Sequence, residues 1–177
     1  MGIDRLENIF HPKSIAVVGG SERPGSIGRA LMHNLIDADF VGPIHPINGK
    51  HASVMGKKAY ASLSEIDDPI DLVVVATPME TVPEIVAECC QIGAAGAVII
   101  SAGGKETGPA GRDLEDRILD VASESGLRII GPNCLGIMCG AARLNASFAA
   151  RMPLDGRLAF ISQSGAICAA VLDLSVK

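Results

Sequence analysis

The feature that most constrains the fold is an alternation of short apolar runs with longer stretches of helical periodicity. Apolar runs lie at 14–18, 43–47, 71–76, 97–101 and 128–130, the second being the weakest. Between them, apolar residues recur every three or four positions at 27–38, 81–92 and 109–125. Short apolar runs are typical of strands buried on both faces, and the spaced pattern is typical of amphipathic helices. The alternation therefore predicts repeated strand–helix–strand units.

Such units close with right-handed crossovers onto a mostly parallel sheet. We therefore predict an α/β fold with a Rossmann-like, doubly wound sheet, whose ligands bind at the carboxyl ends of the strands. The composition agrees: with aromatic residues at 3%, Val, Ile, Leu and Ala must fill the core, and 20 glycines indicate close backbone approaches. In the helix at 109–125, we expect one apolar face, made of Leu114, Ile118, Leu119 and Val121.

Charge and hydropathy argue against two classes of partner. Fifteen basic and 20 acidic residues give a net charge of -5, and the chain has no Trp and one Tyr, so we expect no nucleic-acid partner. The N-terminus lacks an apolar signal region and no stretch reaches about 20 apolar residues, so we expect a cytoplasmic protein with no membrane partner. The cysteines, at 89, 90, 134, 139 and 168, form no CxxC pair, which suits a reducing compartment and predicts no metal site.

The pattern changes after Gly140. Residues 141–155 contain no obvious strand and resemble a connection, after which a strand at 158–162 leads into a helix that starts near Gly165 and continues to the end of the sequence. We therefore predict a Rossmann domain at 1–140, and at 141–177 a linker with the first strand and helix of a second, incomplete domain.

The loop at 19–28, after the first strand, is a candidate anion site. Its glycines allow close approach of a phosphate, and the next helix offers free N–H groups at its start. The spacing is not GxGxxG, which favours a bulkier or differently placed pyrophosphate than that of the usual dinucleotides. The alternative is a purely structural turn between strand and helix.

The end of the second strand bears on the cofactor. An NAD site has Asp or Glu about 20 residues past the glycines. This chain has Asn48, Gly49 and Lys50 instead. A lysine there can pair with a phosphate, so a phosphorylated ribose is favoured over NAD, unless Lys50 is simply a solvated surface residue.

Further strand ends carry turn residues that suit either structure or binding. Thr77 and Pro78 precede Thr81, an expected helix N-cap, and Pro83 falls in the first turn of that helix. Ser101 and Ala102 lead into a second glycine-containing loop. Residues 162–166 (SQSGA) form a second anion cup between a strand and a helix.

A serine hydrolase is not expected. The cup differs from GxSxG because Ser162 stands where the first glycine should be. His11, His33, His45 and His51 offer no convincing base, and we expect them to be ordinary hydrogen-bonded histidines.

Several runs together resemble a known family. They are PKSIAVVGGSERPGSIGRALMHNL, HPINGKHASVMGKKAYASLSEI, DLVVVATPMETVPEIVAEC, AVIISAGGKETG, RIIGPNCLGI, LNASF and LAFISQSGAI. The chain is similar over nearly its whole length to the N-terminal part of NDP-forming acyl-CoA synthetases, of the ADP-forming acetate–CoA ligase type. It resembles more distantly the alpha subunit of succinyl-CoA synthetase.

The resemblance implies a CoA-binding Rossmann domain, followed by the start of a flavodoxin-like domain with an ATP-grasp part elsewhere. The family reaction converts acyl-CoA, phosphate and ADP into acid, CoA and ATP through an acyl phosphate and a phosphohistidine. CoA or acyl-CoA is then the ligand, and ATP, ADP and Mg²⁺ would act only through an ATP-grasp domain or subunit. The resemblance leaves room for a homo-oligomer.

Individual residues follow from the same resemblance. The positions that match CoA-binding ones are Gly25, Ser26, Ile27, Lys50, Thr77, Pro78, Ser101 and Ala102. The positions that match the reaction centre or the site receiving the phosphohistidine are Asn133, Ser162, Ser164 and Gly165. The family's catalytic histidine would lie beyond Lys177, so no catalytic residue is expected in this chain.

The chain departs from its relatives in one loop. Gly104 stands where relatives carry an aromatic or apolar residue, and Gly103 replaces a glutamate of the succinyl type, with Glu106 nearby. Two alternatives share this module: the synthetase-like regulatory region of a GNAT-type protein lysine acetyltransferase, and a stand-alone CoA-binding module that docks on a partner subunit.

Overall fold

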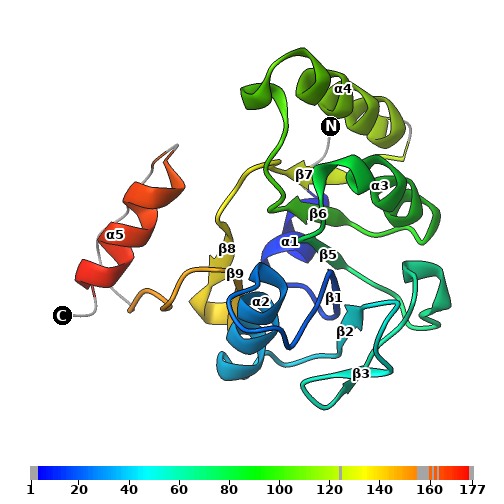
Figure 1. Ribbon diagram of the computed structural model, residues 1–177. Helices are drawn as coiled ribbons and strands as arrows, with labels where there is room; N and C mark the ends of the chain where they lie inside the picture. The colour runs from blue at the N-terminus through cyan, green and yellow to red at the C-terminus, as the bar shows by residue number, and fades with distance from the viewer. Residues whose placement is uncertain (1–3, 124, 155–159, 161, 163, 176–177) are drawn as a thin grey trace.

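The computed structural model describes the chain except residues 1–3, 124, 155–159, 161, 163 and 176–177 (Figure 1). Its strands are β1 (Ile15–Val18), β2 (Ile44–Ile47), β3 (Ser53–Val54), β4 (Lys57–Lys58), β5 (Leu72–Val75), β6 (Gly96–Ile99), β7 (Arg128–Ile130), β8 (Gly136–Cys139) and β9 (Leu144–Ser147). Its helices are α1 (Asp4–Phe10), α2 (Ile27–Asp37), α3 (Val82–Gln91), α4 (Pro109–Ser123) and α5 (Gly165–Ser175). Short 3-10 turns are η1 (Leu63–Glu65), η2 (Met79–Thr81), η3 (Lys105–Thr107) and η4 (Gly140–Ala142).

The main sheet is parallel and has the order β2-β1-β5-β6-β7. Val18 pairs with both Ile47 and Val75, so the carboxyl ends of β1, β2 and β5 lie at one level. The chain moves outward from β1 to β2 and then returns to the other side of β1 at β5, which makes a topological switch point. The predicted α/β, Rossmann-like sheet is therefore confirmed, and each predicted strand of this sheet ends within two residues of the observed one.

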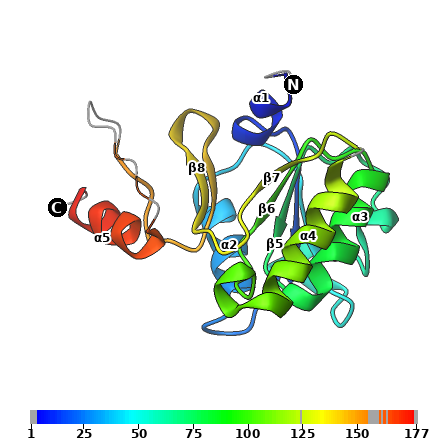
Figure 2. The same cartoon turned by 90° about the horizontal axis from the view of Figure 1, so that it is seen from above.

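Two layers cover the sheet. Helices α1 and α2 and the β8–β9 hairpin lie on one face, and α3 and α4 lie on the other (Figure 1, Figure 2). Every residue of β1, β2, β5 and β6 is buried, which explains their continuous apolar sequence. The edge strand β7 is half-buried. The core is aliphatic, as the scarcity of aromatic residues predicts.

The apolar face predicted for α4 is partly wrong. Ile118 is buried and Leu114 packs against the core, as expected. Leu119 is 61% exposed and Val121 is also exposed, while Ala122 is buried in their place. Positions 114, 118 and 122 are each four residues apart and share one side of a helix, whereas position 119 is turned by about 100° from position 118.

The segment after Gly140 contains a strand that the sequence did not predict. Strand β9 pairs with β8 in an antiparallel hairpin, and all four of its residues are buried. The Asn34 side chain of α2 donates from Nδ2 to the carbonyl oxygens of Ser147 and Ala149, both at 2.8 Å. Residues 144–147 therefore pack with elements that precede residue 140. The division of the chain into two domains stays a prediction.

Helix α5 begins at the predicted glycine, Gly165. The strand expected at 158–162 lies largely outside the described residues. Helix α5 lies apart from the layers around the sheet, on the side of the β8–β9 hairpin (Figure 1, Figure 2). None of its described residues is buried, and Ile167 and Leu174 are exposed.

Candidate functional site

The loop after β1 is closely packed where it leaves the sheet. Gly19 has a φ of +87°, and a Cβ there would lie 2.9 Å from the carbonyl oxygen of Ala76, at the end of β5. A Cβ at Gly28, in the first turn of α2, would lie 1.9 Å from the carbonyl oxygen of Gly19. These two glycines let the start of α2 approach the ends of β1 and β5, which is the close backbone approach that the sequence predicted.

The middle of this loop starts the helix and opens to solvent. Ser26 is the N-cap of α2 and accepts a hydrogen bond on Oγ from Arg29 N at 3.3 Å. Gly25 is exposed and has a φ of +74°. Gly25, Ser26 and Ile27 line a shallow hollow of about 410 Å³ with the segment at 148–150, which follows β9. Sequence reasoning missed this segment, because only the pairing of β9 and its anchorage by Asn34 bring it to α2.

Asn48 joins the ends of β1 and β2. Its Nδ2 donates to the carbonyl oxygen of Gly20 at 2.8 Å, and its Oδ1 accepts from Lys50 N at 2.9 Å. The Lys50 side chain is exposed. Residues 40–64 contain three lysines and no Asp or Glu, in a chain whose net charge is -5. Lys50 therefore places a positive charge where an NAD site would have an acid, and the nearby Glu22 carboxylate accepts a hydrogen bond from Met55 N.

The ends of β5 and β6 are linked through the predicted residues. Ser101 Oγ donates to the Thr77 carbonyl oxygen at 2.5 Å, while Pro78 and Ala102 are exposed. Thr81 precedes α3 as expected, but its side chain does not cap the helix. Its hydroxyl instead donates to the Pro78 carbonyl oxygen at 2.8 Å. Thr81 therefore stands at the expected position, but the expected capping hydrogen bond is not formed. Pro83 lies in the first turn, as predicted.

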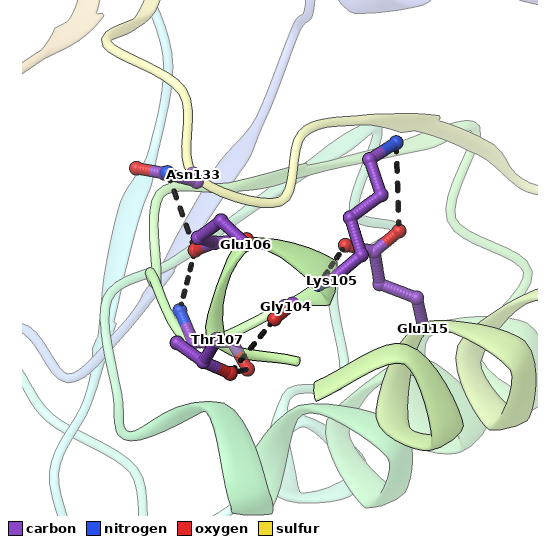
Figure 3. A network of polar contacts seen from close by, with 7 residues as sticks. Gly104, Lys105, Glu106, Thr107, Glu115 and Asn133 are labelled. Carbon is purple, nitrogen blue, oxygen red and sulfur yellow. Dashed lines mark hydrogen bonds and ion pairs between the residues drawn. The ribbon is translucent and has the colours of Figure 1, made fainter. Parts of the chain in front are cut away.

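The ends of β6 and β7 meet in a polar network (Figure 3). Asn133 N donates to the Ser101 carbonyl oxygen at 2.9 Å. Glu106 Oε1 accepts from Gly103 N at 2.9 Å. It also accepts from Asn133 Nδ2 at 3.2 Å (Figure 3). A Cβ at Gly104 would lie 2.2 Å from Glu115 Oε1, at the end of a flexible side chain, so a larger residue at this position would have to displace the Glu115 carboxylate.

A larger cavity of about 1040 Å³ lies between the loop after β7 and helix α5. Three of the predicted reaction-centre residues line this cavity: Asn133, Ser162 and Gly165. The fourth, Ser164, lies at the start of α5, where its Oγ accepts from Ile167 N at 3.4 Å. Ser164 N donates to Ser162 Oγ at 3.0 Å.

Cys134 also lines this cavity but is not an activated thiol. Its Sγ donates to the Ile99 carbonyl oxygen at 3.2 Å. Burial raises the pKa of the Cys134 thiol, which keeps it protonated at neutral pH. Among the described residues, no three His, Cys, Asp or Glu side chains gather into a group that could hold a metal ion.

The predicted residues thus fall at two places along the carboxyl edge of the sheet. One place comprises residues that follow the ends of β2, β5 and β6, namely Lys50, Thr77, Pro78, Ser101 and Ala102. Gly25, Ser26 and Ile27 lie farther along the loop from β1. The reaction-centre set lies by α5. Within the described part of the chain, every helix is too short or too polar to cross a membrane.

Comparison with known proteins identifies the family to which this fold belongs. The family model described as "CoA binding domain" matches residues 13–140. The ADP-forming acetate–CoA ligase of Methanocaldococcus jannaschii is 45% identical over 170 residues, covering 96% of this chain and 24% of the ligase. The alpha subunit of the ADP-forming acetate–CoA ligase I of Pyrococcus furiosus is 41% identical over 175 residues, covering 97% of this chain and 38% of the subunit.

A solved structure shows the same fold. The dinucleotide-forming acetyl-coenzyme A synthetase 1 of Candidatus Korarchaeum cryptofilum, in complex with phosphate and ADP, has a TM-score of 0.91 and 38% identity. The match covers 97% of this chain and 36% of that one. The chain therefore spans about a quarter to two fifths of these relatives, 24% of the ligase and 38% of the alpha subunit, and corresponds to their CoA-binding portion. With the parallel sheet and its glycine-lined carboxyl edge, the match over residues 13–140 means that the chain belongs to the CoA-binding domain family.

Proposed function

We propose that the chain binds coenzyme A at the carboxyl edge of its sheet, as the CoA-binding part of an ADP-forming acyl-CoA synthetase. One observation carries the proposal. At the end of β2, where an NAD-binding sheet carries an acid, Asn48 and Lys50 stand beside the closely packed glycine loop. CoA has a phosphorylated ribose and a pyrophosphate, so it matches a site with a cation at one place and the start of a helix at another.

The proposed contacts follow the strand ends. Lys50 would pair with the ribose phosphate, and Gly25, Ser26 and Ile27 would hold the pyrophosphate near the start of α2. The ends of β5 and β6, at Thr77, Pro78, Ser101 and Ala102, would line the path of the pantetheine arm. The Ser101 hydroxyl already donates to the Thr77 carbonyl oxygen. Ser101 would therefore contribute van der Waals contact with the ligand more than a hydrogen bond to it.

In the whole enzyme, the acyl group would pass from CoA to phosphate and release free CoA. The acyl phosphate would give its phosphoryl group to a histidine and release the acid, and the histidine would then pass that group to ADP to form ATP. We propose that the histidine and the ATP-grasp part that binds ADP and Mg²⁺ belong to other segments of the enzyme. Asn133 would face the reaction centre in the cavity of about 1040 Å³, and the start of α5, at Ser162, Ser164 and Gly165, would receive the phosphorylated histidine.

The domain division belongs to the same proposal. Residues 1–140 would form the CoA-binding domain, and 141–177 would connect to and begin a flavodoxin-like domain. Strand β9 and its contact with Asn34 tie the first part of that connection to the CoA-binding domain.

Calorimetric titration of the chain with CoA, NAD, NADP and ATP tests the proposal. We expect CoA to bind, and K50A to weaken CoA binding about 10-fold or more, because a charge-assisted contact contributes roughly 1.5–3 kcal/mol. The matched control is K13A, since Lys13 is an exposed lysine at the opposite edge of the sheet. Absence of CoA binding, together with clear NADP binding, would overturn the proposal.

A further inference from the structure

Glu106 has no part in the proposed CoA contacts, although it is where two loops at the reaction-centre end of the sheet meet. It belongs to η3, which follows β6, and it contacts Asn133 from the loop after β7 (Figure 3). Its Oε1 accepts from Gly103 N at 2.9 Å and from Asn133 Nδ2 at 3.2 Å. The carboxylate is thus held by its own loop and in turn holds Asn133.

This contact determines which end of the Asn133 carboxamide, nitrogen or oxygen, points toward Glu106. An ionised carboxylate only accepts hydrogen bonds, so the amide must turn its nitrogen toward Glu106 and its oxygen away. Figure 3 shows the Asn133 oxygen pointing away from Glu106. The Asn133 backbone is held as well, because its N–H donates to the Ser101 carbonyl oxygen at 2.9 Å. Asn133 is therefore held both through its backbone N–H and through its side-chain amide.

Glu106 keeps its charge at neutral pH. The hydrogen bond from Gly103 N, and then the backbone N–H of Glu106 itself, lower the pKa of the Glu106 carboxyl below its usual range, although the side chain is exposed. The charged neighbours in this loop are engaged with each other: Lys105 Nζ lies 3.9 Å from Glu115 Oε2, and Lys105 N donates to Glu115 Oε1 at 2.7 Å. Lys105 also acts on the Glu106 charge, and Asn133 donates a side-chain hydrogen bond to Glu106.

We propose that Glu106 is a positioning residue that makes Asn133 a hydrogen-bond acceptor in the cavity of about 1040 Å³, where it receives an N–H or S–H group of the pantetheine arm of CoA. The proposal rests on the proposed function, since it takes CoA as the ligand. It also changes the expected role of Asn133, because a phosphate offers mainly acceptor oxygens. The second Nδ2 hydrogen lies beside the Glu106 carboxylate, so a phosphate approaching it would meet negative charge.

The positioning role has a readout that needs no ligand. In the nitrogen-15 NMR spectrum of the chain, we expect the Asn133 side-chain amide, assigned with N133S, to shift with pH, with a midpoint below the ordinary glutamate pKa. The titration should vanish in E106Q and persist in the matched control E115Q, which keeps an acceptor for Lys105 N. An Asn133 signal that titrates alike in E106Q and the unmodified chain would overturn the positioning role.

The ligand side is tested by calorimetry with CoA, desulfo-CoA and inorganic phosphate. We expect E106A to weaken CoA binding about 3- to 10-fold, as for the loss of one hydrogen bond, while E115Q stays within twofold of the unmodified chain. If the donor is the thiol, E106A should not weaken desulfo-CoA binding further. If the donor is a pantetheine amide, both ligands should lose the same factor.

Two results contradict the proposal on the ligand side. One is CoA binding that E106A leaves unchanged, and the other is phosphate binding that E106A weakens as much as CoA binding. A failure of the unmodified chain to bind CoA would instead contradict the proposed function, and the NMR titration would still report whether Glu106 positions Asn133.

Discussion

His45 shows at the residue scale how burial changes what a side chain does. Sequence reasoning expected ordinary hydrogen-bonded histidines, and this is wrong for His45. Its Nε2 is buried and has no hydrogen-bond partner among the described residues, while Asp68 Oδ2 lies 3.9 Å away. Its ring packs edge-on against Tyr60. Burial lowers the pKa of His45 more than the Asp68 carboxylate raises it.

This burial predicts a loss of stability in mild acid. In the unfolded chain, His45 takes up a proton near pH 6.5, whereas in the folded chain burial opposes protonation of His45. Below that pH, the unfolded state therefore binds more protons than the folded state. The free energy of unfolding should therefore fall as pH drops from about 7.5 to 5.5. Urea denaturation should show a smaller pH dependence for H45F, which keeps an aromatic ring against Tyr60. The exposed His51 supplies the control, and H51Q should leave the pH dependence of the free energy of unfolding unchanged. An equal pH dependence for H45F and the unmodified chain would contradict the role given to His45.

At the scale of elements, α4 shows what periodicity can and cannot predict. The spacing of apolar residues was enough to predict the helix and to place Leu114 and Ile118 on its inner side. It did not distinguish Ala122, which is buried, from Leu119, which is 61% exposed. The helix rotation that selects one set depends on the surface of α3 and the sheet, and no local pattern contains that information.

Two alanine substitutions one position apart test this assignment. I118A removes a side chain that is 2% exposed and should lower the free energy of unfolding by about 2–4 kcal/mol, through lost burial and the cavity left behind. L119A removes an exposed side chain and should change it by less than about 0.5 kcal/mol. Urea denaturation of both variants checks the difference, and a larger loss for L119A would mean that α4 is rotated.

At the scale of the whole molecule, ligand binding and stability are linked. The proposed CoA site uses loops that follow strands scattered from β1 to β6, and their contacts exist only in the folded chain. A ligand that binds only the folded state stabilises it in proportion to the logarithm of its concentration. CoA should therefore stabilise the entire fold.

The expected size of this effect follows from linkage. With free CoA at about 100 times its dissociation constant, the free energy of unfolding should rise by about 2.7 kcal/mol. That corresponds to a rise in melting temperature of roughly 5–10 °C for a domain of this size. Differential scanning calorimetry should show the rise in the unmodified chain and in K13A, a smaller one in K50A at the same CoA concentration, and none with NAD. No rise at a CoA concentration that saturates calorimetric binding would contradict a site made only on folding.

The amino-acid sequence by itself determined the order of strands and helices along the chain, and with it the sheet edge at which we propose the site. Burial on both faces makes a strand apolar throughout, and a helix against a sheet needs apolar residues at a fixed spacing. Both signals lie within a few consecutive residues. The sequence alone also shows that Lys50 stands where an NAD site has an acidic residue, and that the loops are rich in glycine.

Only the tertiary structure decided which distant residues meet. Strand β9 carries too short and mixed a sequence to be predicted, and its pairing with β8 and its contact with Asn34 bury it. Glu106 and Asn133 lie 27 positions apart and come together because β6 and β7 are neighbours in the sheet. Periodicity records how each segment faces the core, whereas contacts between loops depend on the relative placement of whole strands. The fold and the edge proposed for binding were therefore predictable, and the Glu106–Asn133 contact was not.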